Sequence, residues 1–343
     1  MTETPPKRAT IAAVARRAGV SPSAVSHVFN GRPNVSAATA ARIRQAADEL
    51  NWRPNYASRK VSGRGGRSLG LVIARASDTF GRDPFFMRLV AGLTEPLAEI
   101  GWSLSLTLVR VDDEARVYRE WWAEQRVDAF LLVDVRADDP RLDLIGRLAA
   151  PAVVLGAPID ATVPAVTVRD DAAFEAVLAH LAELGHRRVA RVNDAPNLAH
   201  TRARDARFAT AAAGHGIEPS YAVWDAEAED PVADLLGRIG PVTAIIVDSE
   251  VMAAEIVAHA PEIGVSIPER LSVVAWEDSW VSTLVRPRLT ALDAPVEESA
   301  RTAVGLLERL VRGDGVTSQT VGGRRLMIRD STSTAPSVVH GQD

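Results

Sequence analysis

From residue 69 onward, short apolar runs alternate with longer stretches of helical periodicity, and this alternation constrains the fold more than any other feature. Strands separated by helices predict parallel sheets whose faces the helices cover. More than 260 residues exceed one comfortable core, so we expect two doubly wound subdomains with a ligand between them, at the carboxyl ends of the strands. The expected strands are 69–74, 104–109, 129–135, 151–156, 188–192, 242–247 and 271–276, and the expected helices are 86–100, 114–125, 172–184, 204–215, 252–260 and 295–312.

Residues 10–30, TIAAVARRAGVSPSAVSHVFN, form a different pattern, in which two short amphipathic segments flank a glycine turn. Thr10 can cap a first helix that ends at Gly19, and Ser21 can cap a second one. A third helical pattern follows over 36–50. Short helices at this spacing also occur in scaffolds that bind no ligand, but they are typical of a helix-turn-helix that reads DNA.

Charge is distributed unevenly along the chain. Residues 1–67 hold twelve Lys and Arg against three acidic residues, and the remaining residues hold 27 against 41, so a head of charge +9 precedes a body of charge −14. A basic head is the electrostatic footprint of a module that binds the phosphates of nucleic acid. An anionic membrane is the alternative partner, but the head lacks the bulky apolar face of an interfacial helix, so we expect no membrane contact.

The composition narrows the class of protein further. Cysteine is absent, which excludes disulfides and thiolate metal sites. The apolar run 11–15 is too short for a signal peptide, and no run reaches the 18 apolar residues of a membrane span, so we expect a cytoplasmic protein. Residues 62–68, rich in Gly, Ser and Arg, predict a flexible linker.

Catalytic patterns are absent from the sequence. It holds no GxGxxG, Walker or GxSxG motif, and its seven histidines show no metal-ligand spacing, so we expect no enzyme, no cofactor and no metal. Neighbouring acids occur at 112–114, 170–171 and 277–278. Adjacent side chains point in different directions, which is poor geometry for general acid and base chemistry. We expect these acids to be helix caps and solvated charges.

Several segments carry a resemblance that spans nearly the whole chain. They are the head TIAAVARRAGVSPSAVSHVFNGRPNVS, the hinge WRPNYASRKV, and LGLVIA with DPFF, LAELGHRRVARV, RDARF, LSVVAWED, RPRLTAL and LMIRDST in the body. In this order they resemble the lactose-repressor and galactose-repressor family of bacterial transcription regulators.

The resemblance implies a small all-α helix-turn-helix head (1–53), joined by a hinge helix and linker (54–68) to an α/β effector and dimerisation domain (69–333). That domain would have the periplasmic-binding-protein type I fold, with two doubly wound parallel-sheet subdomains. The N-subdomain would cover about 69–166 and 293–322, the C-subdomain about 167–292 and 323–333, and a disordered tail 334–343.

The resemblance also implies a function. The chain would be a sequence-specific transcriptional regulator, most often a repressor, that binds a palindromic double-stranded DNA operator as a homodimer. A small molecule in the cleft between the subdomains would control it allosterically, with a sugar or sugar derivative as the leading class and a nucleoside or purine as the alternative. A further alternative is a sugar-binding receptor that does not bind DNA, but such a receptor would not need the basic head. The tail has no leucine heptads, which favours a dimer over a tetramer.

The DNA-binding residues are expected in the head and the hinge. By resemblance the base readers are Pro22, Ser23 and His27. His27 offers one donor where the family often has an arginine that binds guanine through two, so base preference there is open. Phosphate contacts, which position the head without reading sequence, fall on Ser21, Ser26, Asn30 and Arg32. The remaining positions are Thr10, Asn55, Ser58, Arg59 and Val61.

The effector-binding residues are expected in the body. The resemblance implies that Arg204, in RDARF, lies where the family binds a hydroxyl or anionic group, with a surface ion pair to Asp205 or a nearby acid as the alternative. Phe85 and Phe86 fall where relatives stack a ligand ring, and we expect at least one of them to pack in the core. Glu277 and neighbouring polar positions depart from the usual residues, so the effector should differ from that of the best-known relatives. The other candidates are the apolar platforms Trp224 and Trp276 and the polar residue Ser249.

Val61 occupies the position from which the family commonly inserts a leucine into the minor groove at the operator centre. Valine is shorter and β-branched, so we expect a shallower bend or a central step that kinks easily; packing of one hinge against the other is the alternative. Val61→Leu should therefore tighten operator binding and increase the bend, measured by the gel mobility of circularly permuted operator fragments. Unchanged affinity and bend angle would contradict the wedge.

Overall fold

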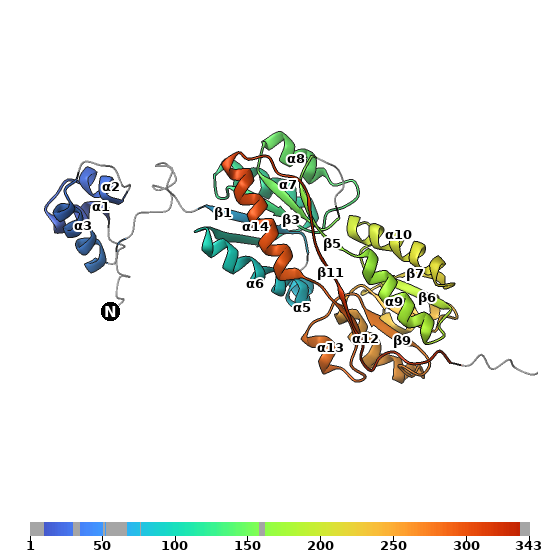
Figure 1. Ribbon diagram of the computed structural model, residues 1–343. Coiled ribbons are helices and arrows are strands. Elements are labelled where there is room, and N and C mark those ends of the chain that lie inside the picture. Colours follow the sequence, from blue (N-terminus) through green and yellow to red (C-terminus); the bar gives the residue numbers. More distant parts are fainter. Residues whose placement is uncertain are drawn as a thin grey trace, which may run out of the picture. The chain divides into compact units, whose positions relative to one another are not determined.

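The computed structural model describes residues 10–29, 35–50, 52, 67–75, 77–157 and 162–336. Packing divides the chain into two compact units, Met1–Arg67 and Ser68–Asp343, and each is described by itself (Figure 1). In these ranges, no helix is long and apolar enough to cross a membrane.

The described part of the first unit contains three helices, α1 (Ile11–Ala18), α2 (Pro22–Phe29) and α3 (Ala37–Glu49). α1 begins after Thr10, whose side chain accepts a hydrogen bond from the Ala13 amide, and ends at Gly19, whose φ of 65° suits glycine. At the start of α2, the Ser21 Oγ accepts a hydrogen bond of 3.2 Å from the Ala24 amide. These contacts confirm the helix starts that the sequence predicts.

One small core joins the three helices. Val14, Val25 and Ile43, one from each helix, are fully buried. Phe29, at the end of α2, packs edge-on against Trp52 with ring centroids 5.2 Å apart. Burial of a large apolar side chain contributes about 1.5–3 kcal/mol, so these contacts fix α2 against α1 and α3.

Two sheets form the second unit, and each is the centre of a lobe (Figure 1). The N-lobe sheet contains β1 (Ser68–Ile73), β2 (Ser103–Leu108), β3 (Ala129–Leu132), β4 (Ala152–Leu155), β5 (Ala165–Arg169) and β11 (Gln319–Gly323). The C-lobe sheet contains β6 (Arg188–Asn193), β7 (Glu218–Val223), β8 (Ala244–Val247), β9 (Ser272–Ala275), β10 (Thr290–Asp293) and β12 (Arg325–Met327). The spatial orders are β11-β5-β4-β3-β1-β2 and β12-β10-β9-β8-β6-β7. β12 pairs antiparallel with β10, and the other described pairs are parallel.

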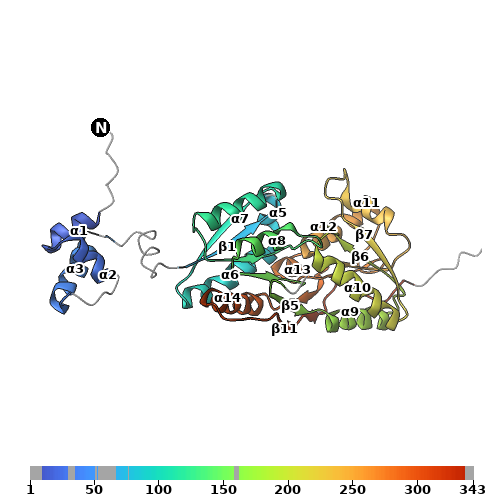
Figure 2. The same ribbon diagram turned by 90° about the horizontal axis from the view of Figure 1, so that it is seen from above.

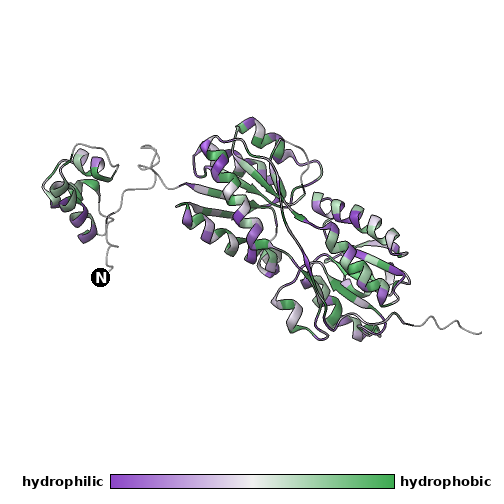
Figure 3. Cartoon of the chain, in the orientation of Figure 1, coloured by the Kyte–Doolittle hydropathy of each residue, from purple (hydrophilic) through white to green (hydrophobic). Residues whose placement is uncertain are grey.

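Helices cover both faces of each sheet. In the N-lobe they are α5 (Ser77–Arg82), α6 (Pro84–Glu99), η1 (Val111–Asp113), α7 (Glu114–Ala123), α8 (Pro140–Leu148) and α14 (Val296–Arg312). In the C-lobe they are α9 (Asp171–Glu183), α10 (Ala199–Gly214), α11 (Pro231–Arg238), α12 (Glu250–His259), η2 (Ala260–Ile263) and α13 (Trp280–Leu284). α6 and α14 lie on one face of the N-lobe sheet, and α7 and α8 on the other (Figure 2). The strands between these helices are predominantly hydrophobic (Figure 3), which confirms the two doubly wound sheets that the sequence predicts.

The chain crosses between the lobes three times in the described part of this unit: from β5 to α9, from β10 to α14, and from β11 to β12. Each crossing starts at the carboxyl end of a strand, so its residues lie beside the space between the sheets. The first and third crossings touch, because the Arg324 Nε lies 2.9 Å from the Asp170 Oδ1.

Some elements were not predicted from the sequence. β7 lies at the edge of its sheet with Tyr221 and Val223 partly exposed, and β11 ends in two glycines, so neither has the continuous apolar run of a central strand. The expected strand 129–135 ends earlier, at Leu132, because Asp134 adopts a left-handed conformation with φ of 49°.

Candidate functional site

A cavity of about 980 Å³ lies between the two lobes of the second unit. Its N-lobe wall comes from the residues that follow β1, β3 and β4, and its C-lobe wall from the residues that follow β6, β8 and β9 together with α10. The cavity therefore lies at the carboxyl ends of both parallel sheets, where the sequence predicts a ligand. On one side the lobes also meet through their backbones, since the Ala199 amide donates to the Val135 carbonyl at 2.8 Å.

Six of the seven predicted effector residues line this cavity: Phe85, Phe86, Arg204, Trp224, Ser249 and Glu277. Phe86 is fully buried in the N-lobe core and meets the partly buried Phe85 edge-on, with ring centroids 5.4 Å apart. Trp224 lies in the opposite wall, in the C-lobe core cluster of α11 and α12. Phe85 and Trp224 thus give the cavity an apolar surface in each lobe.

The seventh, Trp276, does not line the cavity. It is fully buried and stacks on Phe174 with ring centroids 4.0 Å apart. The guanidinium carbons of Arg204 and Arg324 lie 5.5 and 5.3 Å from the centre of its ring. Both arginines line the cavity and Trp276 does not, so this placement does not fit the expected role of a platform for the ligand. The ring instead contacts two cations.

Arg204, on α10, is a buried cation with long contacts. Its nearest acids are Glu277 at 3.5 Å, Asp170 at 3.6 Å and Asp248 at 4.0 Å, none of them within hydrogen-bonding distance. Its Nε is buried and makes no hydrogen bond to the described residues. Burial, and the nearby charge of Arg324, lower the pKa of Arg204. The alternative was a surface pair with Asp205 or a nearby acid. Asp205 binds Arg191 at 2.5 Å instead, and the acids near Arg204 are those of the cavity.

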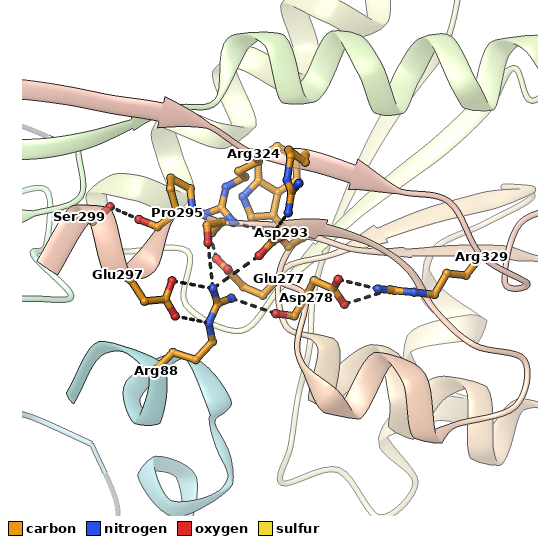
Figure 4. Close-up of polar contacts among 12 residues, drawn as sticks. Arg88, Glu277, Asp278, Asp293, Pro295, Glu297, Ser299, Arg324 and Arg329 are labelled. Atoms are coloured by element: carbon orange, nitrogen blue, oxygen red, sulfur yellow. Dashed lines mark hydrogen bonds and ion pairs between the residues drawn. The ribbon is translucent and has the colours of Figure 1, made fainter. Parts of the chain in front are cut away.

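Arg324, on the third crossing, was not predicted from the sequence. It lies 2.9 Å from Asp170 and 2.9 Å from Glu277, and it donates to the Trp276 carbonyl at 3.0 Å (Figure 4). These acids outweigh the burial of Arg324 and raise its pKa. Arg204 and Arg324 therefore share the same two carboxylates.

The expectation that the neighbouring acids are caps and solvated charges is wrong for several of them. Asp170 and Glu277 pair with Arg324, and Asp278 binds Arg329 at 2.6 Å. Glu114 is 2% exposed and lies 3.1 Å from Arg141. Each partner is distant in the sequence, so local spacing gives no sign of these ion pairs.

Arg88, on α6, connects the N-lobe to the C-lobe. Its guanidinium donates to Glu297 at 3.0 and 3.2 Å, to the Ala294 carbonyl at 3.1 Å, and to the Asp278 carbonyl at 3.2 Å (Figure 4). Asp278 follows the cavity residue Glu277 directly and belongs to the C-lobe. One side chain of the N-lobe is therefore bound to the segment that carries part of the cavity wall.

Other titratable side chains in the cavity also have altered pKa values. Burial, partly opposed by Arg75, raises the pKa of Asp83 to about 6. Burial, together with the charge of Glu277, raises the pKa of Glu250 to about 7. Burial and the charge of Arg204 lower the pKa of His200 to about 4. Burial would raise the pKa of Asp134, but Arg75, whose Nε is 2.6 Å away, lowers it. No sequence motif marks these groups, because burial is what shifts their pKa values.

The head residues lie at the start of α2. Pro22 is its first residue, and the exposed side chain of Ser23 shares a 2.8 Å hydrogen bond with Ser21. Ser26 and His27 are partly exposed on the same helix, and Thr10 caps α1. The remaining predicted DNA-binding residues lie outside the described ranges: Asn30, Arg32, Asn55, Ser58, Arg59 and Val61.

Comparisons with known proteins agree with this geometry. Residues 10–55 match the model for bacterial regulatory proteins of the lacI family, and residues 178–332 match that for a periplasmic binding protein-like domain. A LacI family transcriptional regulator from Bifidobacterium animalis subsp. lactis is 32% identical over 78% of this chain and 98% of its own, with a TM-score of 0.69. The regulator AglR of Rhizobium meliloti is 29% identical over 334 residues, 93% of this chain and 92% of its own. The Lac repressor dimer bound to operator matches 95% of this chain at a TM-score of 0.81 and 23% identity, which shows the shared fold.

A helix-turn-helix head and a two-lobed unit with a cavity between its lobes define a DNA-binding regulator of the periplasmic-binding-protein type. The chain belongs to the LacI family of bacterial transcriptional regulators. As a member of that family it is not an enzyme, and its DNA-binding head and effector domain are those the sequence predicts.

Glu250 should make stability depend on pH. A pKa of about 7 in the folded chain against an ordinary 4.5 means that the folded state holds this proton more tightly, so stability is lost as pH rises from 4.5 through 7. Glu250→Gln, which stays neutral, should therefore raise the free energy of unfolding at pH 8 by up to about 3 kcal/mol and with it the melting temperature. At pH 4.5 it should change both little. Thermal unfolding at both pH values measures this. Glu262→Gln, an exposed change on η2, is the control; an equal gain at both pH values for Glu250→Gln would contradict the burial of its charge.

Proposed function

We propose that the chain is a repressor that binds a palindromic operator as a homodimer in the cytoplasm. A carbohydrate in the cavity between the lobes changes its affinity for that operator. The observation that carries the effector class is the pairing of apolar faces with unsatisfied polar groups in one cavity: Phe85 and Trp224 on the walls, and the Arg204 Nε without a hydrogen-bond partner among the described residues. Sugars present apolar ring faces and a rim of hydroxyls, which suits such a lining.

Relatives support a carbohydrate effector. The CelR regulator, solved as a complex with cellobiose, is 26% identical over 94% of this chain, with a TM-score of 0.70. The ribose operon repressor of Escherichia coli is 29% identical over 311 residues. A hydroxyl oxygen can accept from Arg204 while its hydrogen is donated to Glu277 or Asp170, so one diol would use both kinds of group.

A purine or nucleoside is the second candidate. PurR repressors of Haemophilus influenzae are 29% identical over 318 residues, and two aromatic walls could also hold a base. A base offers fewer hydroxyl groups to the cavity carboxylates, so we favour the carbohydrate.

The effector class is tested by thermal shift of the full chain against sugars, sugar phosphates, nucleosides and purines. We expect a sugar or sugar derivative to raise the melting temperature, and Arg204→Ala to weaken its binding about 10- to 150-fold, since a hydrogen bond from a charged donor contributes about 1.5–3 kcal/mol. Arg202→Ala, an exposed change on the same helix, is the matched control. A rise with purines or nucleosides alone would contradict the carbohydrate effector.

The DNA-binding part has its own test. The full chain should sediment as a dimer and bind one class of palindrome, with an affinity that falls steeply with salt. His27→Ala should relax the preference at one symmetric pair of bases by about 1–3 kcal/mol, whereas Gln45→Ala, exposed on α3, should leave every affinity unchanged. A selection of binding sites from random DNA followed by titration measures both. Equal affinity for all sequences would contradict a specific operator.

A further inference from the structure

The cavity carries more negative than positive charge. Ten of its lining residues are Asp or Glu, and six are Arg. Three of these arginines already have acidic partners. Arg75 binds Asp134 at 2.6 Å, and Arg324 and Arg204 both lie within 4 Å of Asp170 and Glu277. A further carboxylate from a ligand would therefore add to an existing surplus.

Five of the ten carboxylates form no ion pair with any residue that the structure describes, and Asp83 and Glu250 are two of them. Asp83 accepts a hydrogen bond from the Phe85 amide and is near enough to Arg75 for that charge to lower its pKa, but neither Asp83 nor Glu250 forms an ion pair with any residue that the structure describes. Glu250 is 2% exposed. A carboxylate that is shielded from water and has no ion-pair partner is costly in free energy, so carboxylates of this kind in a binding cavity favour a positively charged ligand.

The two carboxylates face the cavity from opposite lobes. Asp83 is the N-cap of α6 in the N-lobe, and Glu250 is the first residue of α12 in the C-lobe, directly after Ser249. They are near enough for the charge of Asp83 to contribute to the raised pKa of Glu250, and Glu277 contributes to the pKa of both. The other charged groups that act on Asp83 are Arg75 and Asp134.

The same cavity offers an unused donor, the buried Nε of Arg204. This nitrogen lies 3.6 Å from Asp170, and the other two nitrogens of the guanidinium lie 4.0 Å from Asp248 and 3.5 Å from Glu277. A neutral hydroxyl oxygen therefore suits Arg204 better than an anion. A ligand that completes the site therefore carries hydroxyl groups at one end and a cation at the other.

We propose that the effector is a polyhydroxylated amine of the amino-sugar class, with its ammonium group between Asp83 and Glu250 and a hydroxyl group on Arg204. The proposal rests on the proposed carbohydrate effector and narrows it. The ammonium group neutralises carboxylates of both lobes at once, so it draws the lobes together, whereas without it two like charges oppose their approach. Sugar phosphates and sugar acids are excluded, because they would place a negative charge among carboxylates.

The first test compares matched ligands on the full chain by titration calorimetry. The probes are D-glucosamine, D-galactosamine and the β-1,4-linked dimer of glucosamine, each against its unsubstituted parent and its N-acetylated form, at pH 7.5. At least one free amine should bind tenfold or more tightly than both its parent and its acetylated form. If parents or acetylated forms bind as tightly as the amines, the amine is wrong while the carbohydrate effector stands. If purines or nucleosides bind and no sugar does, the proposed function fails together with this proposal.

The second test uses the two carboxylates. Asp83→Asn, which still caps α6, and Glu250→Gln should each weaken amine binding at least tenfold. Glu262→Gln, which does not line the cavity, is the control for a lost charge. Titration in buffers of different ionisation enthalpy should show protons released on amine binding at pH 6.5, because the pKa values of Asp83 and Glu250, about 6 and about 7, fall when a cation binds. Binding without proton release, or equal losses in all three variants, would overturn the proposal.

Discussion

Arg324 lies on the segment that joins β11 to β12 and binds Asp170, on the segment that joins β5 to α9, and Glu277, in the wall of the cavity. Its side chain is 4% exposed, so its charge depends on these partners rather than on water. Removal of one member of such a buried ion pair typically costs about 3–5 kcal/mol, because the remaining charge is left without compensation. Two of the three connections between the lobes are held together by this one guanidinium.

The position of Arg324 has a consequence for regulation. Arg204 lies over the same two carboxylates at longer distances, so a ligand group that binds Arg204 also acts on acids that hold the crossings together. The next residue after Glu277, Asp278, is bound by Arg329 and by Arg88 of the N-lobe (Figure 4). Allosteric control requires that a ligand interact differently with two arrangements of the molecule. A contiguous set of charged contacts joins the cavity to both lobes, so a ligand bound there acts on groups of both lobes.

The sequence predicted the fold well because its signals are local. The apolar runs at 129–135 and 242–247 appear as β3 and β8, and the caps Thr10 and Ser21 begin helices as expected. Six of the seven effector residues were placed in the cavity, since the ends of parallel strands converge at one edge of a sheet. Trp276 was misplaced because its strand position gives no information about the arginines that separate it from the cavity.

The sequence by itself determined most of the strands and helices, that a basic head precedes an acidic body, and that this head is of a kind that binds DNA. These properties follow from periodicity, capping and charge, which act over a few residues at a time. Only the tertiary structure decided which carboxylates have a partner. The sequence predicts Asp170 and Glu277 as caps or solvated charges, and Arg324 binds both, whereas Asp83 and Glu250 face the cavity without an ion pair to a described residue. The reason is that burial and the approach of residues about 50 to 150 positions apart set the electrostatics of the cavity.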